Sequence, residues 1–176
     1  MGEEKEYDLL VEGNQMVAAL CQKYPKILWA VNPEHVIVLG ITNKERPKKM
    51  KKLATIHRIS AAMKTIIRAL GRKEVKYYVE VYCSDYSRWS NPRRQWVLFH
   101  ELVHIPSPVD NGGLLQHDCQ DWNGLIDFCG IDWWNKESLP DMLAGEALPL
   151  REELFTRLHI KDEGEDEGSA GGENNA

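Results

Sequence analysis

The sequence lacks the features that would place the protein in a membrane or cross-link it covalently. No run of eighteen apolar residues occurs, which excludes a membrane-spanning helix of ordinary length. The first ten residues, MGEEKEYDLL, are acidic where a secretory signal would be basic and then apolar, so we expect a cytoplasmic protein. The four cysteines are scattered without a C-x-x-C pair, which favours reduced thiols over disulfides or a cysteine-ligated zinc site.

Acidic and basic residues are unevenly distributed along the chain. Residues 161–176 hold six acids and one lysine, and therefore carry the whole formal net charge of −5. Because they contain no large apolar residue, we predict a disordered acidic tail after a single domain that spans residues 1–160. Residues 44–73 contain eleven of the 22 lysines and arginines but only one acid, Glu45. This basic segment indicates either a solvated face or a surface for nucleic acid or an acidic partner. No aromatic residue lies among the basic ones to stack on bases.

The hydrophobic pattern predicts an α+β domain with a small sheet of about three strands. In chain order we expect a helix at 6–22, strands at 35–40 and 53–59, a helix at 60–70, a strand at 75–83, and helices at 91–105, 114–129 and 146–158. Residues 50–70 also fit one continuous helix, although a strand followed by a helix is favoured. The helix before Pro106 is expected to have Asn91 as its N-cap and Pro92 as its first residue.

The motif His100-Glu101-x-x-His104 lies inside the predicted helix that Pro106 ends. Its histidines are one turn apart on the same helix face, so both rings can bind one zinc ion at about 2.0–2.1 Å. Glu101 projects over that face without ligating the ion. There its carboxylate can take a proton from zinc-bound water and pass it to the leaving amine. The motif therefore predicts a zinc-dependent metallopeptidase that hydrolyses protein or peptide substrates.

A catalytic zinc ion needs a third protein ligand, and His117 is the best downstream candidate. We expect it at the start of the next helix, after a turn with a glycine pair; the alternatives are Asp110, Asp118, Asp121 and His159. With His117 as a ligand, Asp118 and Asp121 can accept hydrogen bonds from ligand ring N–H groups, and Asp121 lies one helical turn from His117. A surface salt bridge explains either acid equally well.

The remaining candidate residues precede the motif. Tyr82 and Tyr86 follow the last predicted strand, where they can stabilise an oxyanion or line a cleft, although packing in the core explains them as well. His35 and His57 lie in or beside predicted strands, and we interpret them as structural or exposed.

The run WVLFHELVHIP, then a short glycine-containing loop and LLQHDCQDWNGLIDFCGIDWW, resembles the putative phage-type metallopeptidase family, whose members pair H-E-L-x-H with a downstream H-D motif. The similarity covers roughly residues 7–134, and the chain is more distantly similar to SprT-like minimal zincins. The resemblance implies a compact minimal zincin-like domain, in which the edge strand of the sheet flanks the cleft over the motif helix and a ligand helix.

Carried over residue by residue, the resemblance makes His100, His104 and His117 ligands of Zn²⁺ and Glu101 the catalytic acid and base. It also draws attention to Asp118, the second member of the H-D pair. Two other functions remain open. One is a non-catalytic interaction module that zinc stabilises, although a closed structural site has no use for Glu101. The other is a SprT-like protease recruited to nucleic acid through residues 44–73, which predicts binding that weakens steeply with salt.

Overall fold

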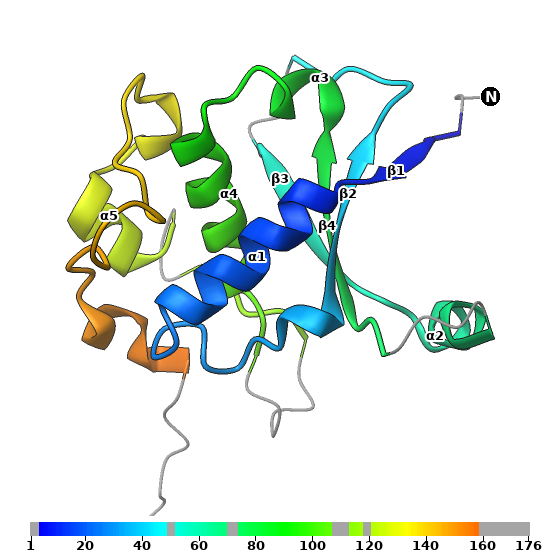
Figure 1. Cartoon of the computed structure of the whole chain (residues 1–176), viewed down its shortest axis with the longest axis horizontal. Helices are drawn as coiled ribbons and strands as arrows, with labels where there is room; N and C mark the ends of the chain where they lie inside the picture. The colour runs from blue at the N-terminus through cyan, green and yellow to red at the C-terminus, as the bar shows by residue number, and fades with distance from the viewer. Residues whose placement is uncertain (1–3, 49–51, 70–73, 107–112, 118–120, 159–176) are drawn as a thin grey trace, which may run out of the picture.

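A computed structural model describes residues 4–48, 52–69, 74–106, 113–117 and 121–158. Its centre is a mixed four-stranded sheet in the order β1-β2-β4-β3 (Figure 1). The strands are β1 (Tyr7–Leu9), β2 (Val36–Ile41), β3 (Ala54–Arg58) and β4 (Tyr77–Tyr82). The two central strands, β2 and β4, run parallel, whereas β1 and β3 pair antiparallel at the two edges.

The longer helices lie mainly on one side of this sheet (Figure 1). The α-helices are α1 (Val11–Lys23), α2 (Ala61–Ala69), α3 (Cys83–Tyr86), α4 (Asn91–Val103) and α5 (Asn123–Cys129), and the short 3₁₀ turns are η1 (Pro33–His35), η2 (Trp133–Asn135) and η3 (Glu152–Leu158). Helices α1 and α4 pack on the sheet, while α2 projects beside the end of β3 and β4. None of the described helices combines the length and hydropathy that a bilayer crossing requires.

Alternation along the strands separates a closed face from an open one. Val38, Val79 and Val81 are fully buried on the face that the helices cover. Helix α1 approaches this face closely at Gly13, where an added Cβ would lie 3.0 Å from the side chain of Val38. Alternate residues such as Tyr78 point to the opposite face, over which no helix of the described part of the chain lies. The sheet is therefore a wall between a packed interior and a partly exposed surface.

Helix α4 is the central helix of the packed side. Its N-cap is Ser90, whose hydroxyl accepts a hydrogen bond from the backbone N–H of Arg93. Trp96, Leu98 and Phe99 are all fully buried, and Leu102 is as well, so apolar residues cover most of the circumference of α4. A helix that is apolar on so many sides is stable only inside a core, which places the motif against both the sheet and the following segments.

The structure confirms most of the predicted elements and corrects four. The strand at 53–59 and the helix that follows it are present. The predicted helix at 6–22 is instead β1 followed by α1, because Tyr7–Leu9 gains its hydrogen bonds by pairing with β2. The N-cap of α4 is Ser90, not Asn91. Residues 114–117 are not helical, and α5 begins only at Asn123. The last helical segment is the 3₁₀ turn η3.

The predictions for the acidic tail and for the cysteines have different outcomes. The acidic tail, residues 161–176, lies outside the described residues, and the division at residue 160 therefore stays a prediction. Cys21, Cys83 and Cys129 are free, as expected for reduced thiols. Cys119 also lies outside the described residues.

Candidate metal centre

The two motif histidines lie at the C-terminal end of α4, after the buried apolar residues of its middle. His100 lies in the last turn, and His104 is the C-cap residue. Their ring centroids are 5.3 Å apart, as expected for an i, i+4 pair on one face. Because Trp96 and Leu102 anchor the same helix in the core, both rings are held in place by a rigid element.

His104 is oriented by the segment that follows α4. Its Nδ1 lies 2.7 Å from the backbone carbonyl of Leu115, and the Leu115 N–H in turn donates to the His104 carbonyl at 2.8 Å. The first contact requires a proton on Nδ1, which leaves Nε2 with its lone pair. Burial holds the pKa of His104 down at about 4, and nearby His100 and His117 act in the same direction. The ring is thus neutral at neutral pH, as a metal ligand must be.

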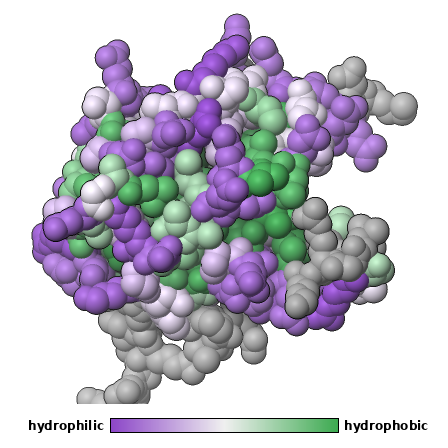
Figure 2. All heavy atoms as spheres, viewed as in Figure 1, coloured by the Kyte–Doolittle hydropathy of each residue, from purple (hydrophilic) through white to green (hydrophobic). Residues whose placement is uncertain are grey.

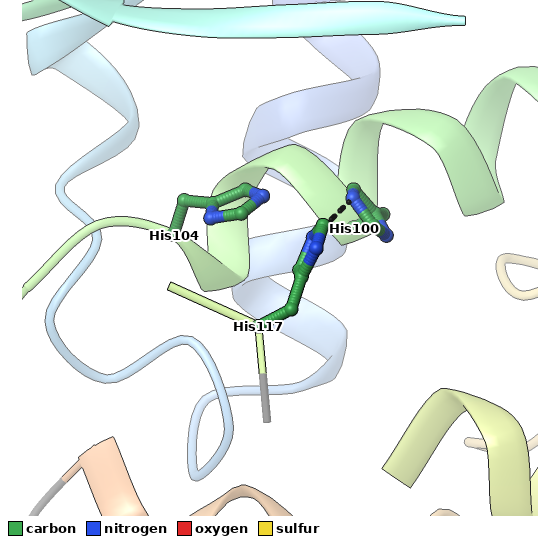
Figure 3. Close-up of side chains that lie close together, drawn as sticks. All are labelled: His100, His104 and His117. Atoms are coloured by element: carbon green, nitrogen blue, oxygen red, sulfur yellow. Dashed lines mark hydrogen bonds between the residues drawn. The ribbon is translucent and has the colours of Figure 1, made fainter. Parts of the chain in front are cut away.

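His117 joins the two motif histidines from a segment that is neither helix nor strand (Figure 3). Its Nε2 lies 3.1 Å from Nε2 of His100, and one ligand nitrogen from each of the three rings lies within 4.8 Å of the others. Two imidazoles bound tetrahedrally to one zinc ion at about 2.0–2.1 Å would have their nitrogens roughly 3.3 Å apart. The His100–His117 pair is close to this spacing, and all three rings are near enough to one another to hold a single metal ion.

Asp121 supports the cluster, but through a different histidine from the one predicted. Its carboxylate oxygen Oδ1 lies 3.0 Å from Nδ1 of His100. The same carboxylate accepts hydrogen bonds from the Trp122 backbone N–H and the Trp133 indole N–H, both at 2.7 Å. Burial alone would raise the pKa of Asp121, but His100 and these N–H donors outweigh it and lower the pKa. Asp121 is therefore a buried, ionised carboxylate that orients His100.

Glu101 is buried beneath the cluster and held by the edge strand. Its Oε2 accepts a hydrogen bond from the backbone N–H of Ile56 at 2.8 Å, and its Oε1 lies 4.0 Å from Nε2 of His100. Burial raises the pKa of this carboxyl group, although His100 and the Ile56 N–H act in the opposite direction. The side chain is near Nε2 of His100 without being one of the three converging groups. A carboxylate in this position can accept a proton from a group held at the histidines.

Tryptophan rings form part of the wall around the histidines. The centroid of the Trp122 ring lies 4.9 Å from that of His104 and 5.2 Å from that of His117. The Trp122 indole N–H donates a hydrogen bond to the His100 carbonyl. The ring centroids of Trp133 and His100 are 5.9 Å apart. Sequence reasoning missed both residues and also Ile56. The only available signal was the position of Trp122 directly after Asp121, because the contacts of Trp133 and Ile56 depend on segments distant in the chain.

Of the remaining site candidates, the structure describes only Tyr82 and Tyr86. Asp118 and Asp110 lie outside the described residues, as does His159. Tyr86 packs against Trp89 and beneath the guanidinium of Arg94, near the opposite end of α4 from His104. Tyr82 ends β4 beside Ile41 of β2 and is buried. Both tyrosines are therefore buried side chains that pack in the interior.

Comparison with protein families agrees with this arrangement. Searches of curated proteins and of solved structures give no match. A family model does match, over residues 10–143, and its description is putative phage metallopeptidase. The match includes all three histidines, Glu101 and Asp121, and it does not test the more distant likeness to SprT-like proteins. Since the matched region covers most of the chain, the protein belongs to the putative phage metallopeptidase family.

Proposed function

We propose that the protein is a zinc-dependent peptidase in which His100, His104 and His117 hold the metal and Glu101 is the general base. The convergence of the three ring nitrogens within 4.8 Å is the observation that supports this function most directly. Imidazole donors favour zinc over magnesium or calcium, which prefer oxygen ligands. A bound zinc ion would polarise the scissile carbonyl and lower the pKa of a water molecule to about 7.

Glu101 is suited to move the proton that this reaction releases. Burial raises its pKa, so the carboxylate takes up a proton more readily than an exposed glutamate would. The hydrogen bond from Ile56 holds one oxygen and leaves the other on the side of His100. The protonated carboxyl group can then donate to the leaving amine, so one residue is acid and base in turn.

We propose that the substrate binds as an extended peptide strand along the outer edge of β3. The Ile56 N–H points away from β4, because it donates to Glu101. In an antiparallel pair, every second residue directs its backbone groups outward, so Ala54 faces the same edge. A peptide could add to this edge by backbone hydrogen bonds, which bind many sequences with little selectivity. The scissile bond would then lie beside the Glu101 carboxylate.

The experiment compares Glu101→Gln with wild type in metal content and peptide cleavage. The variant should retain one zinc ion per chain by elemental analysis, while its kcat/KM on an unstructured protein substrate falls by about 10²–10⁴-fold. The exposed variant Glu34→Gln is the matched control and should cleave at the wild-type rate. Cleavage by Glu101→Gln at the wild-type rate would show that another group is the base.

A chelator melt distinguishes the non-catalytic alternative. A closed structural zinc site contributes much of the folding free energy, so its removal would unfold the domain. The described core is large, and many of its members belong to α1 and the sheet rather than to the segments that carry the histidines. We therefore expect the metal-free protein to stay folded, with a modest fall in Tm that excess zinc restores. Complete unfolding on chelation, together with no cleavage by zinc-loaded protein, would favour the structural module.

A further inference from the structure

Basic side chains line a cavity between α2 and the segment that leads into β4. The cavity has a volume of about 170 Å³ and is lined by Lys64 and Arg68 of α2 and by Glu74, Val75 and Lys76, which lead into β4. Lys64 and Arg68 are one helical turn apart, so both project from the same side of α2. Three cations face one carboxylate, and the cavity therefore attracts an anion such as a phosphate group.

The carboxylate in this cavity is only loosely held. Glu74 lies 3.7 Å from the Arg68 guanidinium and 3.7 Å from the His35 ring, and its side chain is 58% exposed. Ion pairs this long and exposed contribute little stability. A phosphate oxygen can consequently replace the carboxylate at Arg68 without breaking a strong interaction.

Lys76 of the cavity leads into β4, whose uncovered face carries aromatic rings. Lys76 and Tyr78 are two residues apart, so strand alternation puts them on the same face. The Tyr78 ring stacks on His57 of β3, with centroids 4.7 Å apart and planes 20° from parallel. Figure 2 shows hydrophobic residues in a hollow on this side of the molecule, between the N-terminal strand and α2. The nearby carboxylate of Glu80 is neutralised by Lys5 at 2.7 Å.

We propose that this phosphate face, defined as Lys64, Arg68, Lys76 and the Tyr78–His57 ring pair, binds single-stranded nucleic acid. The cations would contact backbone phosphates, and an unpaired base would stack on Tyr78. A free phosphate ion explains the cavity but not the aromatic pair beside it, nor the eleven basic residues between 44 and 73. The absence of aromatic residues from that segment is no obstacle, because the adjacent strand β4 supplies the ring.

The proposal is independent of the peptidase, because the phosphate face shares no residue with the metal centre. Binding is measured on the full chain by fluorescence anisotropy of a labelled 20-nucleotide dT oligomer, at several salt concentrations. The double variant Lys64→Glu/Arg68→Glu should weaken binding by about tenfold or more at low salt and reduce the slope of log K against log salt by about 1.4. Tyr78→Ala should weaken binding by about tenfold, whereas Tyr78→Phe retains it.

The matched control is Lys26→Glu/Arg151→Glu, which changes the net charge equally but breaks only exposed ion pairs elsewhere. It should bind the oligomer nearly as wild type does, apart from a small uniform loss. Equal binding by wild type and the α2 double variant would overturn the proposal. Tighter binding to a duplex of the same length, or no effect of Tyr78→Ala in a folded variant, would overturn the single-strand assignment. Binding to anionic vesicles with no oligomer binding would identify a membrane surface instead.

Discussion

The two faces of the sheet use their polar residues in different ways. On the closed face, the carboxylates of Glu101 and Asp121 are buried and accept hydrogen bonds from N–H donors, of which Ile56 and Trp133 belong to other elements of the fold. On the open face, most charges belong to exposed side chains of α2 and the adjoining loops. The strand β3 separates these environments, since Ile56 holds Glu101 while its neighbour His57 stacks on Tyr78. Interactions on the closed face should therefore be measurable as stability and metal affinity, and those on the open face as salt-dependent binding.

The largest expected effect comes from Asp121→Ala on the closed face. The substitution leaves the Trp133 indole N–H, the Trp122 N–H and the His100 ring without their carboxylate. We expect about 3–5 kcal/mol of destabilisation, because one partner of a buried polar network is removed. Zinc affinity should also fall by about 10–100-fold, because the His100 ring is no longer oriented. Urea unfolding and competition with a zinc indicator measure the two effects.

A matched control for this variant is Asp127→Ala on α5. Asp127 is 39% exposed and lies 3.4 Å from Arg151 at the surface. Its loss should cost less than about 1 kcal/mol and leave zinc affinity unchanged. If Asp121→Ala bound zinc as tightly as the control, the carboxylate would not be what orients His100, and the contrast between buried and exposed acids would fail at this site.

Replacing a buried and an exposed methionine by alanine tests the same difference between the two faces with apolar residues. Met142 is fully buried on the closed side, whereas Met63 on α2 is 48% exposed. Met142→Ala should cost about 2–5 kcal/mol, because it leaves a cavity in a packed core. Met63→Ala should change stability by less than about 0.5 kcal/mol. Urea unfolding of both variants gives the difference directly, and a cost above 1 kcal/mol at Met63 would mean that α2 packs on a partner or on the sheet.

The motif residues were predictable because their geometry is local. A spacing of four residues in a helix fixes the relation of His100 to His104, whatever the rest of the fold does. The choice of His117 rested on chemistry, since few other imidazoles follow the motif. Its backbone was predicted incorrectly, however, because apolar spacing in residues 114–129 favoured one long helix.

The contacts that orient these residues could not be predicted from the sequence, because most of them join different elements of the fold. The false helix placed Asp121 one turn from His117, whereas the real chain brings it to His100. The Ile56 N–H reaches Glu101 only because β3 is the edge strand next to α4, and sheet order is not encoded in any short pattern. Strand β1 has three residues, too few for a periodic signal, and depends on pairing with β2. Local chemistry was thus more predictable than the tertiary contacts that orient it.

Glu80 provides the most delicate test, because it is a buried carboxylate on the open face. It is 8% exposed and accepts hydrogen bonds from Lys5 at 2.7 Å and Tyr7 at 2.6 Å. Burial alone would raise its pKa, but these two donors outweigh burial and lower the pKa. A carboxyl group with a lowered pKa stabilises the fold above its unfolded-state pKa of about 4.3, and this contribution is lost as pH falls through the folded-state value.

Glu80→Gln should therefore destabilise the protein by about 1 kcal/mol at pH 7, since a neutral amide accepts both hydrogen bonds more weakly. The difference from wild type should shrink as pH falls below about 4.3. Unfolding free energies from urea titrations between pH 3 and pH 7 give this profile. Tyr7→Phe removes one donor but keeps the charge, so it should show a smaller difference of the same sign. A wild-type advantage that stayed constant across the range would mean that packing of β1 over the sheet, rather than the ionised carboxylate, stabilises this part of the open face.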